Sequence, residues 1–485
     1  MYSGYETTIN EEDLWFEQPQ RSSDIQLPPV INTILLVVWA VISLIGIAVI
    51  FLGKNTMAGI IIAAVPTFIG MVIKPTFALC ILMLILPTGS GIGAAADFSL
   101  DRGVGLAVAV SFMLNLLITR PRFRIDNKAL WVFVLYTIWV LLMSLAAPYP
   151  ALEIRRAFTQ IQLLALTFIV YWILYTNDWT TFRWALRAYV LGTLGTIALA
   201  VVTGAAIRSM DETSESRYSA TVGQAIDANM LASIVCLAFL AAIYLFARDK
   251  KVLWRLFYLV SMLVFPIMLL KIGSRGALIG LAFTMLSPLL FVRQVLHRPA
   301  MAVLVLVVVL LASISAGLVI SRVGLESDVS NRLTDIYRAE EAVGYRMMPI
   351  KKAMGCIVEK PIGTSYYGWF EYSGLRIIPH NDFFMALGLY GIPAVGLFVF
   401  FMIMLMFTVK RIPLGYEKLF ARAILTFLLV MGLDVPQLYQ KHFWVFLVFI
   451  IVCERIAAYF TEPQEEDIED ETEEFDNETA MEETA

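Results

Sequence analysis

The sequence predicts an all-α fold, a polytopic bundle of transmembrane helices. Of the 485 residues, 59% are hydrophobic and 16% are charged, whereas about a quarter of the residues in a soluble domain are charged. The apolar runs are continuous, as in Ile31–Leu52 and Met301–Ile320. Each is close to the roughly 20 residues that cross a bilayer as a helix. A transmembrane β-barrel would instead show short strands of alternating polarity.

The apolar runs predict about fourteen spans, with twelve to fourteen as the range, each bounded to within several residues. They lie at 31–52, 57–73, 76–88, 103–118, 129–147, 157–176, 183–203, 229–246, 254–271, 275–292, 300–320, 383–408, 418–433 and 442–460. The third of these is short and bounded by prolines, so it accounts for part of the range.

The orientation follows from the short basic loops, which are retained on the cytoplasmic side. Four alternate loops carry this basic excess, at 120–128, 248–255, 293–298 and 410–418. Both chain ends are then cytoplasmic as well. The loops predicted to be external are 148–156, 204–228, 272–274, 321–382 and 434–441. The largest loops are external, and loops carry function on a rigid scaffold, so the chemistry is expected on the outer face.

The two ends of the chain differ from the rest. Residues 1–29 are polar and net acidic, which predicts a cytoplasmic arm rather than a signal peptide. Residues 461–485 form a tail with 13 acidic residues and no basic one. This composition predicts a disordered cytoplasmic segment. Without the tail, the chain has 36 basic and 27 acidic residues.

The predicted external loops are unexpectedly basic. Arg217 lies in the first large loop, and Arg346 and Lys360 lie in the second. Guanidinium groups match phosphate oxygens with paired hydrogen bonds, which favours an anionic ligand. The alternative is that these cations pair with acidic residues of the same loops. Arg275 stands at the outer end of a span, where the positive end of the helix also favours an anion. Snorkelling of its side chain to the interface is the competing explanation.

His380 occupies the outer mouth of a span, in the run Pro379-His380-Asn381-Asp382. A histidine at a wet membrane rim is suited to accept a proton or to orient a hydroxyl group. A structural role is the alternative. Asn381 or Asp382 is expected to cap the helix that follows.

An apolar stripe recurs at helical spacing within the 321–382 loop, which predicts a helix there. The stripe consists of Val343, Met347, Ile350, Met354 and Ile357. Such a helix either lies on the membrane surface or caps the bundle. Pro349 is expected to kink the helix or to mark its start.

Four polar segments follow one another along the second part of the chain. The first runs from Arg217-Tyr218-Ser219 to Asp227-Ala228-Asn229, and the second is Ser274-Arg275-Gly276. The third joins Arg346 to Lys360-Pro361-Ile362-Gly363, and the fourth is Pro379-His380-Asn381 followed by Gly388, Gly391 and Gly396. In order and spacing, these segments resemble the O-antigen ligase/polymerase family of integral membrane glycosyltransferases. The resemblance covers about residues 150–460. It divides the chain into N-terminal transmembrane helices at 30–205 and a ligase-like region at 206–460 that includes the 321–382 loop.

The resemblance implies a reaction at the outer face of the bacterial inner membrane, in polysaccharide or lipopolysaccharide biosynthesis. The donor is a glycan on undecaprenyl diphosphate, and a hydroxyl group of a lipid or glycan acceptor attacks it. Arg217 and Arg275 are expected to be catalytic at the diphosphate, and His380 at the acceptor. Arg346, Lys360, Asn381 and Asn229 are expected to bind substrate. Metal ions, cofactors and nucleic acids are not expected to take part, and membrane lipids surround the chain.

Two other functions remain open. A repeat-unit polymerase of the same family uses the same donor and differs only in its acceptor. A transporter or flippase of lipid-linked glycans would suit the number of spans. Transporters commonly contain repeated halves and polar residues at the middle of the membrane. Here no repeat is evident, and the polar groups cluster at one rim.

Overall fold

The computed structural model describes residues 56–91, 100–120, 125–202, 206–210, 216–222, 224–225, 228–286, 336–375 and 377–459, with single positions between 24 and 49. Most of the predicted arm, the predicted span at 300–320 and the acidic tail at 461–485 lie outside the described residues. So do residues 321–335, the first part of the predicted external loop.

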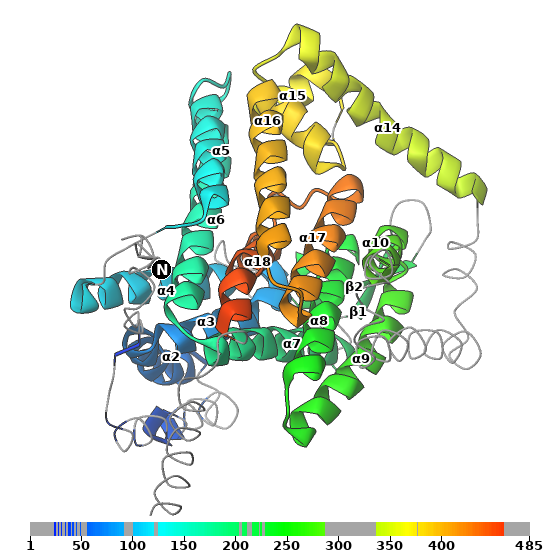
Figure 1. Ribbon diagram of the computed structural model, residues 1–485. Helices are drawn as coiled ribbons and strands as arrows, with labels where there is room; N and C mark the ends of the chain where they lie inside the picture. The colour runs from blue at the N-terminus through cyan, green and yellow to red at the C-terminus, as the bar shows by residue number, and fades with distance from the viewer. Residues whose placement is uncertain are drawn as a thin grey trace, which may run out of the picture.

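The described chain is mainly helical, as the apolar runs predict (Figure 1). Twelve of the predicted spans coincide wholly or partly with described helices. The helices are α2 (Thr56–Ile73), α3 (Pro75–Ile85), η2 (Leu86–Gly91), α4 (Leu100–Thr119), α5 (Lys128–Leu145), α6 (Pro150–Thr176), α7 (Trp179–Val202), α8 (Ala228–Arg248), α9 (Val252–Ile272), α10 (Arg275–Leu286), α14 (Ile336–Glu359), α15 (Tyr366–Ser373), α16 (Asp382–Arg411), α17 (Tyr416–Asp434) and α18 (Lys441–Tyr459).

Six of the described helices are long and apolar enough to cross a membrane. They are α4, α5, α6, α8, α9 and α16, with the span of α4 beginning at Arg102. Helices α2, α3 and α10 contain shorter apolar segments. The chain is therefore a helical protein with several potential membrane spans.

The middle of the bundle is built around α8 and α18, which are apolar on most of their circumference. Residues Leu231–Ala242 of α8 and Phe443–Cys453 of α18 are buried throughout. A helix that is apolar on all sides belongs in the interior of a helical protein. Aromatic rings hold α18 against α5, where Phe133 and Trp444 stack with their centroids 3.7 Å apart.

A small antiparallel sheet departs from the all-α prediction. It joins β1 (Ala206–Met210), β2 (Ser216–Val222) and β3 (Gln224–Ala225) in that order. Arg208 pairs with Tyr218 across the first ladder. The predicted 204–228 loop is therefore partly a β-meander, and β2 lies against α7, α8 and α9.

A second correction concerns the predicted 148–156 loop, because α6 begins at Pro150. Proline suits the first helical position, and Glu153 supplies an acidic group to the first turn. The charges at Glu153, Arg155 and Arg156 lower the local hydropathy, so the predicted span starts two turns too late. In contrast, the predicted tight turn at 272–274 is confirmed, with Gly273 in the left-handed conformation (φ 67°).

The predicted helix within the large loop is confirmed as α14, which contains Pro349 in its interior. Ala353 and Cys356 of α14 are buried, while Met347, Met354 and Ile357 of the predicted stripe are 39%, 53% and 45% exposed. Helix α14 thus packs on the bundle through small side chains and leaves most of its apolar stripe uncovered. Together with α15 it lies at the top of Figure 1.

Contacts between elements sort the connections onto two ends of the bundle. At one end, Tyr367 donates its N–H to Glu153, and Asn381 bonds to Leu433. At the other end, Tyr175 bonds to Asp126 (2.5 Å), and Arg248 bonds to Glu417. The connections between helices therefore alternate between the two ends of the bundle.

Candidate functional site

The first turns of α8 and α10 are joined by their side chains. The Ser274 hydroxyl donates to Oδ1 of Asn229 over 2.9 Å and accepts from the N–H of Ala277 at 3.4 Å. The Asn229 carbonyl in turn accepts from the Ser233 hydroxyl at 3.0 Å. These bonds fix the backbone that carries Arg275, the first residue of α10.

Asn381 caps α16, which confirms one of the two predicted caps, Asn381 or Asp382. Its Oδ1 accepts from the N–H groups of Phe383 (3.0 Å) and Phe384 (3.2 Å). Its amide nitrogen donates to the carbonyl of Leu433, 3.2 Å away in α17. The start of α16, directly after His380, is therefore tied to the end of α17. His380 itself is half-buried.

Asp382 fixes the same junction from the other side. Its Oδ1 accepts from the N–H groups of Gln437 (2.7 Å) and Leu438 (3.1 Å). The side chain is 1% exposed, and its Oδ2 has no hydrogen-bond partner in the described part of the chain. A buried carboxylate oxygen is costly to leave unpaired, so this atom is a candidate to accept a hydrogen bond from a ligand hydroxyl, and not to meet an anion.

The two junctions meet through the α17–α18 connection. Gln437 donates from its side chain to the Ser233 hydroxyl at 3.5 Å. Asp434 lies so close to α10 that a Cβ added at Gly276 would stand 1.8 Å from its carboxylate. The starts of α8, α10 and α16 thus converge with the end of α17. Helix N-termini carry partial positive charge and exposed N–H groups, which suit an anion, and at the start of α10 the Asp434 carboxylate already lies beside them.

The Pro361–Ser365 segment of the predicted external loop docks on a break in α16. The carbonyl of Pro361 accepts from the N–H of Ile392 (2.8 Å), and the N–H of Ser365 donates to Leu389 (2.8 Å). The break is at Gly391, whose φ of 77° interrupts the helix. The motif segments 360–364 and 388–391, far apart in sequence, are therefore in direct contact.

The predicted basic residues are spread over three places. Arg217 lies on β2, opposite Ser209, and Arg275 begins α10. Arg346 lies in α14, and Lys360 follows it with an exposed side chain. The side chains of Arg217, Arg275 and Arg346 lie outside the described atoms. The structure therefore brings together the segments of Asn229, Arg275 and Asn381. Lys360 lies apart from them, exposed at the end of α14.

Sequence reasoning missed Gln437 and Ser233, and it considered Asp382 only as a helix cap. The available signal was an acidic residue directly ahead of a long apolar run. In the part of the chain that the structure describes, no group of three or more histidine, cysteine, aspartate or glutamate side chains is arranged to hold a metal ion.

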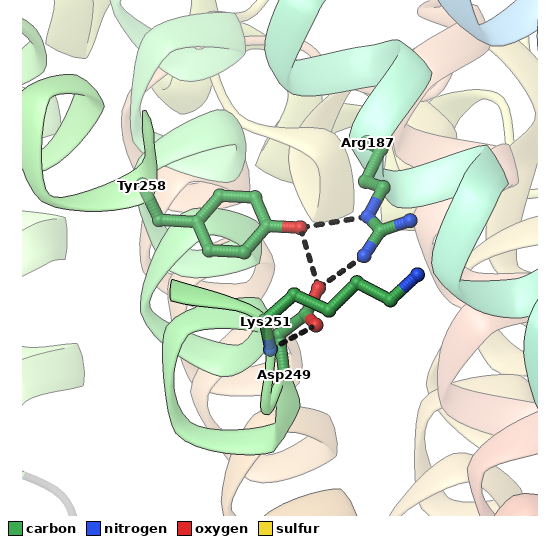
Figure 2. Close-up of polar contacts among 4 residues, drawn as sticks. All are labelled: Arg187, Asp249, Lys251 and Tyr258. Atoms are coloured by element: carbon green, nitrogen blue, oxygen red, sulfur yellow. Dashed lines mark hydrogen bonds and ion pairs between the residues drawn. The ribbon is translucent and has the colours of Figure 1, made fainter. Parts of the chain in front are cut away.

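A buried charged cluster joins α7 to the connection between α8 and α9, and Figure 2 shows its side chains. Arg187 of α7 is 2% exposed; it donates to the Tyr258 hydroxyl at 2.8 Å and forms a short ion pair with Asp249. Its guanidinium also lies 4.6 Å and 4.1 Å from the ring centroids of Trp184 and Trp254.

The Asp249 carboxylate of this cluster is fully engaged. Burial alone would raise its pKa, but hydrogen bonds from Arg187, from the N–H of Lys251 and from Tyr258 hold that pKa below its ordinary value. Both oxygens of Asp249 have partners, whereas in Asp382 only Oδ1 has partners among the described residues. The cluster is therefore a structural clamp between α7 and the α8–α9 connection.

Comparison of the chain with protein-family models finds no match, and comparison with curated proteins likewise finds none.

Proposed function

We propose that this chain is a membrane glycosyltransferase that transfers a glycan from undecaprenyl diphosphate to an acceptor hydroxyl at the outer face of the bacterial inner membrane. The observation that carries the proposal is the convergence of the first turns of α8, α10 and α16. Asn229 and Arg275 lie in the first turns of α8 and α10, and Asn381 caps α16; all three are expected from the resemblance to O-antigen ligases.

In the proposed reaction, the acceptor oxygen attacks the anomeric carbon of the donor sugar. The bond between that carbon and the diphosphate oxygen breaks, and undecaprenyl diphosphate leaves with the bonding electrons. Arg217 and Arg275, assisted by Arg346, stabilise the negative charge that develops on the diphosphate. His380 accepts the proton of the acceptor hydroxyl or orients that hydroxyl. Lys360, Asn229 and Asn381 contribute to binding the substrates.

The proposal includes a topology of about fourteen spans with both termini in the cytoplasm. The end of the bundle that holds His380, Asn381 and α15 then faces outward. A donor with its isoprenoid chain in the bilayer would present its diphosphate near that end. The grouping of connections onto two ends of the bundle supports this arrangement.

The test is a transfer assay with the purified full chain in lipid nanodiscs. The donor is undecaprenyl diphosphate carrying the glycan extracted from the source envelope, supplied with lipid A–core in one arm and without it in the other. Attachment to lipid A–core defines a ligase, and lengthening of the lipid-linked glycan defines a polymerase. In a parallel assay with the chain in sealed vesicles, movement of intact donor across the bilayer without cleavage of its diphosphate–sugar bond would refute the proposal in favour of transport.

A further inference from the structure

Another polar cluster surrounds Glu153 in the first turn of α6, at the end of the bundle that also holds the start of α16. This side chain is 0% exposed. Its Oε1 accepts a 2.6 Å hydrogen bond from the N–H of Tyr367 in α15. Its Oε2 has no hydrogen-bond partner among the described residues. An unpaired buried carboxylate oxygen destabilises a fold. A hydrogen-bond donor on a bound ligand would satisfy this oxygen.

The neighbours of Glu153 are aromatic and cationic. Arg156, three residues further along α6, places its guanidinium 4.0 Å from the ring centroid of Tyr366 and 5.5 Å from that of Tyr439. The Tyr439 phenol shares a short hydrogen bond with the Tyr390 phenol of α16. The cluster therefore combines a carboxylate, a guanidinium and several phenols, drawn from α6, α15, α16 and the α17–α18 connection.

This cluster adjoins the junction at the start of α16. The α17–α18 connection donates two N–H groups to Asp382 through Gln437 and Leu438. Its next residue, Tyr439, belongs to the Glu153 cluster. Burial raises the pKa of the Tyr439 phenol, which therefore stays neutral and able both to donate and to accept. A ligand that reaches from one cluster to the other would follow this short connection.

The chemistry of the cluster selects a neutral, polyhydroxylated ligand. An anionic group near Arg156 would also face the buried Glu153 carboxylate, and an ammonium group near Glu153 would also face the Arg156 guanidinium, so a charged ligand group gains little here. A sugar hydroxyl donates to a carboxylate and accepts from a guanidinium or phenol, while the apolar face of the sugar ring packs on an aromatic ring. Few but well-placed polar groups among aromatic side chains are typical of small-molecule sites.

We propose that Glu153, Arg156 and Tyr366 form a subsite that binds a sugar residue of the glycan substrate. The inference rests on the proposed function, because the glycan is the substrate named there. Glu153 accepts a sugar hydroxyl at Oε2, Arg156 donates to a second oxygen of the sugar, and Tyr366 fixes the guanidinium by stacking. The subsite binds the glycan, while the α8–α10–α16 junction meets the diphosphate.

The test measures binding rather than transfer, so that it can fail independently of the proposed reaction. The purified full chain and its Glu153→Gln variant are titrated with three probes. These are undecaprenyl diphosphate alone, the same carrier bearing the envelope glycan, and the free glycan released from it by mild acid. Glu153→Gln keeps the shape of the side chain and the acceptor for Tyr367. We expect it to weaken glycan binding about tenfold to a hundredfold, because a hydrogen bond to a charged group is lost.

The control is Glu371→Gln, which neutralises an exposed carboxylate at the same end, bonded to the Tyr149 hydroxyl at 3.3 Å. Glycan affinity should not change in this variant. Loss of affinity in Glu153→Gln for the carrier-linked glycan, but not for the bare carrier, assigns the subsite to the donor sugar. Loss for the free glycan alone assigns it to an acceptor glycan.

A second variant, Tyr366→Ala, removes the ring beneath Arg156 and should also lower glycan affinity by about tenfold if the ring positions the guanidinium. Equal glycan affinity in the wild type and Glu153→Gln overturns the inference, as does the absence of glycan binding by the wild-type chain. A transfer-active chain with either result would leave the proposed function standing without this subsite. A chain that binds the glycan through this subsite but does not transfer it would support the subsite and refute the proposed function.

Discussion

The hydroxyl of Ser274 donates a 2.9 Å hydrogen bond to the side-chain oxygen of Asn229, joining the starts of α8 and α10, two helices that are separated in the sequence by α9. The same hydroxyl accepts from the N–H of Ala277 and so caps α10. One small side chain therefore sets both the start of α10 and its position relative to α8. The residue between this hydroxyl and Gly276 is Arg275, so the bond orients the backbone from which that arginine projects.

Replacing Ser274 with alanine should lower the free energy of unfolding by about 1 kcal/mol, the usual cost of removing a helix cap. Transfer activity should fall more than stability does, because the backbone at Arg275 loses its tie to Asn229. Thermal unfolding in detergent and the transfer assay measure the two effects. Ser274→Thr keeps the hydroxyl and should restore most of both. Equal activity in the alanine variant and the wild type would contradict a positioning role.

Replacing Gly391 with alanine should destabilise the chain by about 2–4 kcal/mol, because a left-handed backbone and overpacking both add strain. A Cβ there would stand 2.3 Å from the carbonyl carbon of Ile362. Gly396, one turn further along α16, is the matched control, because a Cβ there meets nothing within 4 Å. Gly396→Ala should be neutral or stabilising by up to about 1 kcal/mol. Thermal unfolding of the two variants decides whether the docking of residues 361–365 on α16 is rigid.

These relationships mark the limit of what the sequence predicts. Apolar length and helix-end chemistry act locally, so most helix positions, the Asn381 cap and the Gly273 turn can be predicted from nearby residues. The start of α6 was missed because Glu153 and Arg156 are charged, and only tertiary burial reveals that they belong to a helix. The β1–β2 ladder was missed because its strands are short and strand stability depends on pairing partners.

The candidate site divides in the same way. The positions of Arg275 and His380 at the starts of helices follow from the sequence. The burial of Asp382 and its bonds to Gln437 and Leu438 depend on how α16 meets the α17–α18 connection, which no local pattern encodes. The contact between Pro361 and Ile392 likewise depends on long-range backbone pairing, although the glycines at 363 and 391 hinted at close approach.

The Arg187–Asp249 clamp predicts a dependence of stability on pH. Because the pKa of folded Asp249 lies below that of the unfolded chain, the stabilisation is complete above about pH 3.9, the ordinary aspartate pKa. It is lost as the pH falls through the lower pKa of the folded state. Arg187→Met should cost about 3–5 kcal/mol at neutral pH, because it leaves a buried carboxylate unpaired.

The comparison that isolates this effect is the stability gap between wild type and Arg187→Met. Without the guanidinium, protonation relieves the buried charge of Asp249, so the gap should narrow as the pH is lowered from 6 to about 3, below the ordinary aspartate pKa. Unfolding temperatures at each pH measure it. A gap that stays constant across this range would show that Arg187 acts by packing against Trp184 and Trp254 instead.

The topology predicts opposite accessibility for two exposed positions. Cysteine introduced at Glu371 in α15 should react with a membrane-impermeant maleimide added to intact spheroplasts. Cysteine introduced at Leu414, between α16 and α17, should react only after the membrane is opened. The wild-type chain is the blank, because Cys236, Cys356 and Cys453 are buried and Cys80 is half-buried. Labelling of the Leu414 variant from outside would invert the proposed orientation.

The last prediction concerns the two residues to which the proposed reaction assigns the diphosphate and the acceptor. Arg275→Ala should lower the transfer rate by about 10²–10³, as does the loss of a donor to a developing anion. Arg275→Lys should recover only part of this, because a single ammonium cannot form the paired bonds of a guanidinium. His380→Ala should lower the rate by about 10²–10⁴ if the imidazole is the general base, with a loss of the acid limb of the pH–rate profile. If His380 only orients the acceptor, the profile should keep its shape while the KM for the acceptor rises. Protein yield and unfolding temperature should match those of the wild type in all three variants. Full activity of the Arg275→Ala, His380→Ala double variant would remove the basis for placing the reaction at the junction of α8, α10 and α16.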